Sequence, residues 1–219
     1  MRATGVLAVL CLVTLVLAGC GGSNPGAASA TSTATSVGSA APSGETAAAG
    51  LPAFVGDLDR VCETQVGFGG TAAYDATPGI HPVALFYDYG EPPSLIEASV
   101  TLPAGWAITQ DANYADSSEF AALQLIACSR RTKAVPNGTM CDFTPSGGGT
   151  TTTLELTDTA YEMTVYAAAT GQPVGKPKTL EASDAECPMI AAFKESDTRF
   201  LNTPTEDQYV AALKGFVAP

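Results

Sequence analysis

The sequence predicts a mainly β domain, a sandwich-like or strongly curved antiparallel sheet with one C-terminal helix. Two patterns predict this fold class. Between residues 82 and 174, short segments of alternating or continuous apolar residues recur, and turns rich in Gly and Pro separate them, which is typical of strands. Near the C-terminus the apolar residues recur at helical spacing instead.

Two strands are expected in the first half of the domain. Residues 82–89 (PVALFYDY) form a mostly apolar run that stops at Gly90, which suits a buried strand. In residues 95–102 apolar and polar side chains alternate, which predicts a strand with one buried face.

A hairpin is expected around the turn pattern Pro136-Asn137-Gly138. Residues 120–128 (FAALQLIAC) fit both the helical and the strand periodicity, and their length favours a strand. The turn pattern follows, and residues 140–143 then resemble a returning strand. Such a hairpin would bring Cys128 close to Cys141.

Further strands are expected at residues 152–157 and from Tyr161 onward, where large apolar side chains occupy every second position. Thr170-Gly171 offers a tight turn into the next segment. Prolines at 173 and 177 cannot donate to a sheet ladder, so the returning strand should lie at an edge.

The C-terminal helix is predicted by a start pattern and by an apolar stripe. Thr203, Pro204 and Glu206 supply a cap, a proline at the first helical position and a glutamate at the third. The stripe that follows would pack against the sheet and consists of Tyr209, Val210, Leu213 and Phe216.

The N-terminus has the pattern of an export signal. Arg2 precedes an apolar run at residues 6–17, which is too short to span a bilayer comfortably. Ala18 and Gly19 before Cys20 resemble the bacterial lipobox. The resemblance implies cleavage between Gly19 and Cys20 and attachment of acyl chains such as palmitate to the Cys20 thiol; secretion with cleavage near residues 27–30 is the alternative.

Three parts follow from this pattern. Residues 1–19 are the lipoprotein signal peptide, and residues 20–50 are the lipidated Cys20 and a flexible tether of Ala, Ser, Thr and Gly. A coil of that length spans roughly 30 Å. Residues 51–219 form a single disulfide-bonded β domain. We expect the protein at the cell membrane, lipid-anchored, with the domain facing outside the cytoplasm.

The chain is strongly acidic, with 10 basic and 22 acidic residues. Removal of Arg2 with the signal leaves 9 − 22 = −13. This charge argues against binding to nucleic acid or to anionic lipid, so the lipid anchor alone would hold the protein at the membrane. The local cluster Arg130-Arg131-Lys133 is interpreted as solvated surface.

Four cysteines remain in the exported domain: Cys62, Cys128, Cys141 and Cys187. Without a CxxC pair or neighbouring histidines, they indicate two disulfides rather than a zinc site. Three pairings are open. We favour Cys128 with Cys141, across the expected hairpin, and Cys62 with Cys187.

Candidate ligand contacts are His81 and Trp106, although both also suit a structural role. A single histidine, with no Gly-x-Ser-x-Gly motif, gives no catalytic triad. The carboxylate pairs Asp57 with Asp59 and Asp88 with Glu91 do not match a calcium loop. We therefore assign no catalytic, cofactor-binding or metal-binding residue.

A series of short motifs runs along the domain. In order they are Cys62, GIHPV at 79–83, LPAGW at 102–106, LIAC at 125–128, CDF at 141–143, residues 161–169 with Thr170-Gly171, and Cys187-Pro188. This order resembles a group of exported bacterial lipoprotein domains of unassigned function. The resemblance implies an extracytoplasmic disulfide-bonded domain and no particular activity.

These features predict a membrane-anchored lipoprotein with a non-enzymatic binding or adaptor domain in the cell envelope. Its partner would be an envelope protein, a peptide or a small molecule, and no cofactor is expected. The alternative is a hydrolase of envelope polymers that uses paired carboxylates.

Overall fold

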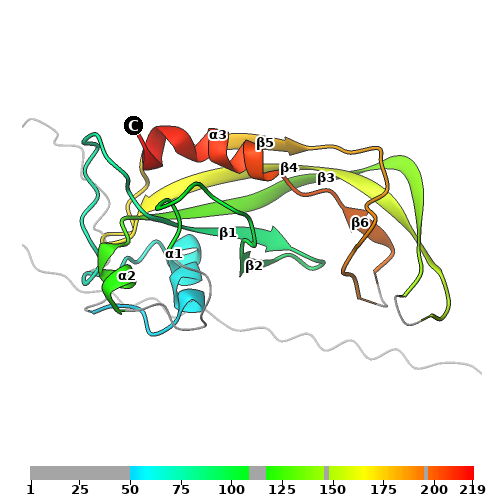
Figure 1. Ribbon diagram of the computed structural model, residues 1–219, viewed down its shortest axis with the longest axis horizontal. Coiled ribbons are helices and arrows are strands. Elements are labelled where there is room, and N and C mark those ends of the chain that lie inside the picture. Colours follow the sequence, from blue (N-terminus) through cyan, green and yellow to red (C-terminus); the bar gives the residue numbers. More distant parts are fainter. Residues whose placement is uncertain (1–49, 109–116, 146–147, 195–196) are drawn as a thin grey trace, which may run out of the picture. The chain divides into compact units, whose positions relative to one another are not determined.

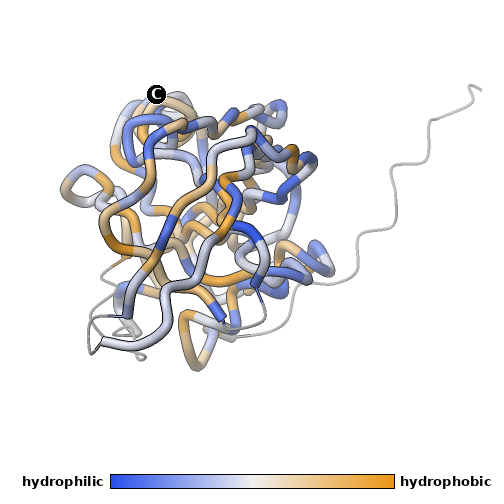
Figure 2. Tube along the Cα trace, turned by 90° about the vertical axis from the view of Figure 1, so that its right-hand side faces the viewer, coloured by the Kyte–Doolittle hydropathy of each residue, from blue (hydrophilic) through white to orange (hydrophobic). Residues whose placement is uncertain are grey.

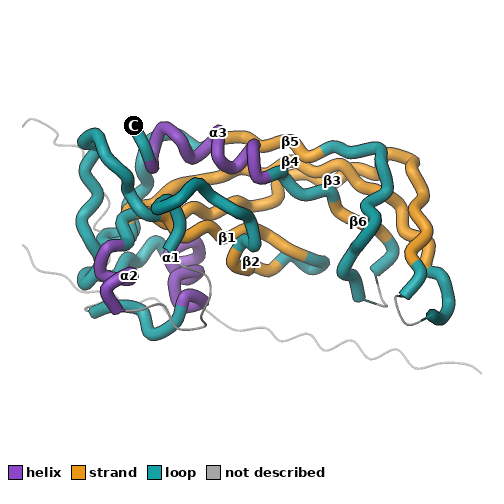
Figure 3. The backbone as a smooth tube through the Cα atoms, in the orientation of Figure 1, coloured by secondary structure: helices purple, strands orange, loops and turns teal. Residues whose placement is uncertain are grey.

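The computed structural model describes residues 50–108, 117–145, 148–194 and 197–219, which belong to one compact unit, Gly44–Pro219. Its centre is a six-stranded mixed sheet in the order β2-β1-β3-β4-β5, with β6 also paired to β4. The fold class is therefore confirmed: mainly β, with a C-terminal helix (Figures 1 and 3). The strands are β1 Val83–Tyr89, β2 Ser94–Glu97, β3 Leu125–Phe143, β4 Thr152–Ala167, β5 Lys178–Ala182 and β6 Arg199–Leu201.

Helices cover both faces of this sheet at one end. Strand alternation sends Leu125 and Ala127 of β3 to one face, where they pack against α3 (Glu206–Val217). It sends Ile126 to the other face, toward η1 (Val55–Leu58), α1 (Asp59–Thr64) and α2 (Ser117–Ala122). Figure 1 shows α3 on one side of the sheet and α1 and α2 on the other. In Figure 2 the hydrophobic stretches gather toward the centre, between these layers.

The expected hairpin at Pro136-Asn137-Gly138 is wrong. β3 runs through this segment, which forms an irregularity in the ladder between Pro136 and Met140, with Gly138 at a φ of +85°. The chain reverses later, between Phe143 and Thr152, so β3 and β4 form one long hairpin. A Pro-Asn-Gly pattern fits a bulge as well as a turn, and here the ladder with β4 continues on both sides of it.

The favoured disulfide pairing is wrong for the same reason. Cys128 and Cys141 lie on one strand, 141 − 128 = 13 positions apart, or about 40 Å at about 3.3 Å per residue. The bonded pairs are instead Cys62 with Cys128 and Cys141 with Cys187. The expectation that all four cysteines form disulfides is confirmed.

Two predicted strands are shorter than expected. Residues 95–102 contribute only the last three residues of β2, because the chain leaves the sheet after Ala98 and turns at Pro103 toward Trp106. Residues 120–128 divide between α2 and the start of β3, since Gln124 and Leu125 turn back to bond the Pro82 carbonyl oxygen. The ambiguous periodicity of that segment reflects both elements.

The later elements agree with the sequence. Tyr161 and Met163 of β4 are fully buried under α3. β5 is an edge strand, as predicted, but it begins only after Pro177. Gly171 adopts a φ of +71° in the predicted turn, where an added Cβ would collide with the Gln65 carbonyl oxygen. α3 begins two residues later than expected, with Thr205 as its cap and Gln208 completing the capping box.

The signal at residues 1–19, Cys20 and the tether 20–50 lie outside the described residues, apart from Gly50. Within the part of the chain that the structure describes, none of the helices is both long and apolar enough to cross a bilayer.

Candidate functional site

Both predicted contact residues lie in the packed interior. His81 is 3% exposed, and its Nδ1 and Nε2 lie 2.8 Å from Gln124 Oε1 and from the Thr77 carbonyl oxygen. Trp106 is buried in the core under α3. Neither is among the described residues that line the cavity introduced next. The structure thus gives both side chains a packing role.

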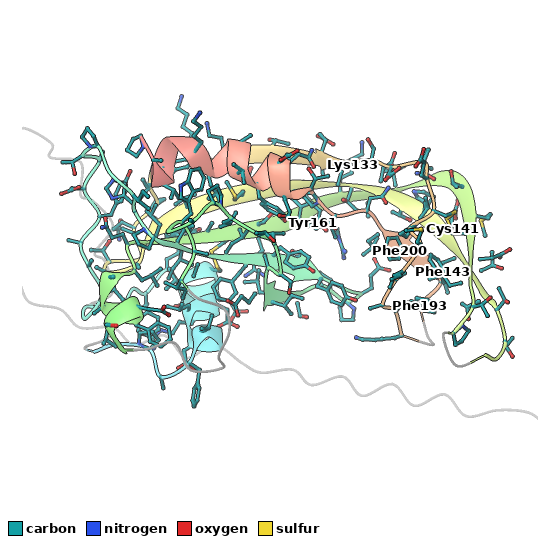
Figure 4. All side chains as sticks on the ribbon, viewed as in Figure 1. Lys133, Cys141, Phe143, Tyr161, Phe193 and Phe200 are labelled. Carbon is teal, nitrogen blue, oxygen red and sulfur yellow. A yellow bond between two sulfur atoms is a disulfide. The ribbon has the colours of Figure 1, made fainter. Side chains whose placement is uncertain are left out.

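A cavity of about 300 Å³ opens where β1 ends, and we call it the β1–β6 pocket. It lies between that end of β1, the middle of β3 and β4, and the segment 190–203 that contains β6. Figure 4 shows Tyr161 on β4, Phe200 on β6 and Phe193 near it. The aromatic part of its wall consists of Tyr87, Tyr89, Tyr161, Phe193 and Phe200.

Strand register places the floor of the pocket on the face that α3 covers elsewhere. Arg131 of β3 stands directly opposite Tyr161 of β4, and Ser129 stands opposite both Met163 of β4 and Tyr87 of β1. Opposite residues in adjacent strands project to the same face. The apolar core beneath α3 therefore continues into a floor that carries an arginine and tyrosine hydroxyls.

Arg131 is the buried charge of this floor, with a side chain only 7% exposed. Its Nη2 donates to the Gly90 carbonyl oxygen at 3.0 Å and lies 3.7 Å from Glu91 Oε1. Its backbone N–H donates to Asp88 Oδ2 at 2.9 Å, while Asp88 Oδ1 pairs with Arg130 at 3.1 Å. Nη1 of Arg131 is buried and has no hydrogen-bond partner among the described residues.

Sequence reasoning missed Arg131, which it assigned to a solvated cluster. The interpretation holds for Lys133, which is exposed, and in part for Arg130, whose side chain is 40% exposed. It is wrong for Arg131. Consecutive residues of a strand face opposite sides, so two adjacent arginines within a strand could have indicated that one points inward.

The Tyr161 hydroxyl adds a second unused donor beside Arg131. The ring is fully buried, and its oxygen has no well-formed hydrogen bond within the described part of the chain. Burial raises the pKa of this phenol, which outweighs the opposing effect of the nearby Arg131 charge. The group is therefore a neutral O–H at physiological pH.

An ion pair joins β6 to the turn after β1 at the rim of the pocket. Arg199 Nε donates to Glu91 Oε2 at 2.8 Å, and Arg199 Nη2 donates to Glu91 Oε1. These hydrogen bonds lower the pKa of Glu91 and outweigh the opposing effect of desolvation. Glu91 is thus held as a carboxylate by two arginines.

The segment that closes the pocket is fastened to the far end of the hairpin. The Cys141–Cys187 disulfide fixes its start, and Phe193 and Phe200 pack on Phe143 with ring centroids 5.4 and 5.9 Å away. The Tyr89 hydroxyl donates to the Ala192 carbonyl oxygen at 3.2 Å. At the mouth, Ile190 lines the pocket although it is 89% exposed.

The carboxylate pairs proposed for hydrolysis are engaged elsewhere. Asp57 accepts from the backbone N–H groups of Ala53 and Phe54 at the start of η1, next to Asp59 on α1. Asp88 and Glu91 reach the pocket, but each is paired with an arginine. Across the described ranges, no three His, Cys, Asp or Glu side chains gather as a metal site would require.

Comparisons of the chain with protein-family models, with curated proteins and with solved structures gave no match.

Proposed function

We propose that this chain is a lipid-anchored extracytoplasmic binding protein that holds a small amphipathic molecule in the β1–β6 pocket without altering it chemically. The pocket itself carries the proposal. Its volume of about 300 Å³ falls at the lower end of the range for small-molecule sites. Its wall combines aromatic side chains with charged ones, and convergent polar groups of this kind can fix the orientation of a ligand.

Two disulfides support an oxidising compartment, as expected for a domain outside the cytoplasm. The lipobox-like residues ahead of Cys20 support attachment at the membrane surface. A ligand that is partly apolar suits this position, because the membrane is where such molecules concentrate.

The charges around the pocket favour binding over hydrolysis. A general acid needs a carboxyl group with a raised pKa, whereas the arginine hydrogen bonds lower the pKa of Glu91. Asp88 is buried and paired with Arg130. Neither group is placed as the proton donor that the hydrolase alternative requires.

The test uses N-phenyl-1-naphthylamine, a neutral apolar dye that fluoresces when it enters an apolar site. We expect saturable binding to the domain and its loss in Ala192→Trp, because residue 192 lines the pocket and the indole would fill it. Ala185→Trp is the matched control, since Ala185 is exposed and is not a pocket-lining residue. Equal binding by the two variants would overturn the proposal.

A further inference from the structure

We infer that the pocket is selective for a singly charged anion, a carboxylate carried on an apolar body, which Arg131 Nη1 and the Tyr161 hydroxyl bind together. The inference rests on the proposed function, because it names the class of ligand for the same pocket. It begins from two buried polar groups: Arg131 Nη1 has no partner among the described residues, and the Tyr161 hydroxyl lies beside the Arg131 and Thr159 side chains.

Arg131 has spare capacity as a donor. A guanidinium carries five N–H groups, and among the described residues this side chain makes one well-formed hydrogen bond, from Nη2 to the Gly90 carbonyl oxygen. Nη1 is buried without a partner among the described residues, and the side chain lines the pocket. A buried charge with unmet donors is unfavourable unless a partner occupies the site. An anion in the pocket would supply that partner.

The Tyr161 hydroxyl lies on the same floor, since Tyr161 and Arg131 stand opposite each other in adjacent strands. Its oxygen is buried and without a well-formed hydrogen bond in the described part of the chain. A neutral phenol donates to an anion without adding charge. The pair therefore offers one charged and one neutral donor, which matches the two oxygens of a carboxylate.

The carboxylates around the pocket limit the charge of the ligand. Arg130 pairs with Asp88, and Glu91 lies between Arg199 and Arg131. With Asp197 of the lining, three arginines face three carboxylates, so these groups together carry no net charge. A dianion such as a phosphate monoester would meet the repulsion of Glu91 and Asp197. A monoanion meets one free guanidinium edge.

The aromatic part of the wall would hold an apolar body. Beyond the two donors, the lining includes Tyr87, Phe193 and Phe200, and Ile190 extends it to the mouth. Aromatic walls favour a flat or branched hydrocarbon body, because burial of its apolar surface against the rings contributes binding free energy.

The experiment compares two dyes with the same aromatic body. 8-Anilinonaphthalene-1-sulfonate carries one negative charge, and N-phenyl-1-naphthylamine carries none. We expect the wild-type domain to bind the anionic dye more tightly. Arg131→Gln and Tyr161→Phe should each weaken its binding, about tenfold or more for the arginine, as loss of a charged hydrogen bond predicts. In both variants the ratio of anionic-dye affinity to neutral-dye affinity should fall, because the neutral dye has no charged group for these donors to bind.

Lys133→Gln is the control for loss of one positive charge, because Lys133 lies on the same strand, is exposed and is not part of the lining (Figure 4). It should leave both affinities unchanged. If Arg131→Gln fails to fold, Tyr161→Phe still tests the site, because it removes one oxygen and keeps the buried ring.

The outcomes separate the two proposals. If neither dye binds, the proposed function fails and the inference fails with it. If the neutral dye binds in the pocket and the anionic dye gains nothing from Arg131 or Tyr161, the function stands and the anion site is wrong. Equal losses in Lys133→Gln would also contradict the site, because they would reflect overall charge.

Discussion

Arg131 differs from its neighbour Arg130 only in the side of the strand on which it lies. Arg130 reaches Asp88 with 40% of its side chain exposed, whereas Arg131 is 7% exposed in the floor of the pocket. Its charge is tolerated there because Glu91 lies 3.7 Å away and Gly90 accepts a hydrogen bond. The N–H groups of Nη1 have no partner among the described residues, so they can donate to a bound ligand.

At the scale of single residues, the ion pair between Arg199 and Glu91 at the rim of the pocket should make the stability of the domain depend on pH. The pKa of Glu91 is lowered from 4.5, so the pair contributes fully above about pH 4.5 and is lost as pH falls through the lower folded value. We expect Glu91→Gln to reduce the free energy of unfolding at pH 7 by about 1 kcal/mol or less, because the pair is partly exposed.

Urea unfolding at a series of pH values measures this effect as the difference between wild type and Glu91→Gln. The difference should shrink as pH falls below about 4.5 and through the lowered pKa of folded Glu91, because a protonated Glu91 no longer pairs with Arg199. Glu162→Gln removes an exposed carboxylate from β4 and is the control. A difference that grows on acidification would refute the account of the pair.

At the scale of elements, the β3–β4 hairpin decides how much the sequence could predict. Alternation predicted the strands around Tyr161 and the buried face under α3, because both depend on local periodicity. It did not predict the length of β3, since Pro136-Asn137-Gly138 has the composition of a turn and only the ladder with β4 makes it a bulge. The pocket was missed for this reason, because its floor lies on the misassigned strand.

The two disulfides should have separable roles. They close loops of 66 and 46 residues, so the chain-entropy model gives about 4 kcal/mol for each. We expect the double variants Cys62→Ser with Cys128→Ser and Cys141→Ser with Cys187→Ser to lose similar stability in urea. Only the second pair should weaken binding of N-phenyl-1-naphthylamine, because Cys187 fixes the segment that closes the pocket.

Binding is compared at low temperature without denaturant, with near-ultraviolet circular dichroism to show that each variant is folded. If the folded Cys62 and Cys128 variant loses dye binding while the other retains it, the assignment of the closing segment is wrong.

On the scale of the whole molecule, the acidic charge, the linker and Cys20 define how the domain would be presented. A net side-chain charge of −13 after processing gives the domain no attraction to an anionic bilayer. Attachment would therefore depend on the lipid at Cys20, and the low-complexity linker would hold the pocket off the surface. The charge, the linker and the lipobox-like motif can be read directly from the sequence. A pocket cannot, because it depends on contacts between residues that are distant in the sequence.

Cys20→Ala should release the protein from membranes or leave it as an unprocessed precursor. Fractionation of cells that express the full-length chain, followed by immunoblotting, measures both outcomes. Cys11→Ala lies within the expected signal and is the matched control, which should remain processed and membrane-bound. Mature, membrane-bound Cys20→Ala protein would refute the lipid anchor.

The most direct test of the central claim is mass spectrometry of small molecules released from the full-length protein after gentle extraction from its own membranes. The wild type should carry a singly charged, largely apolar carboxylate that is depleted in both Ala192→Trp and Arg131→Gln and retained in Ala185→Trp. The same compounds in all four proteins, or none in the wild type, would contradict a binding function for the β1–β6 pocket.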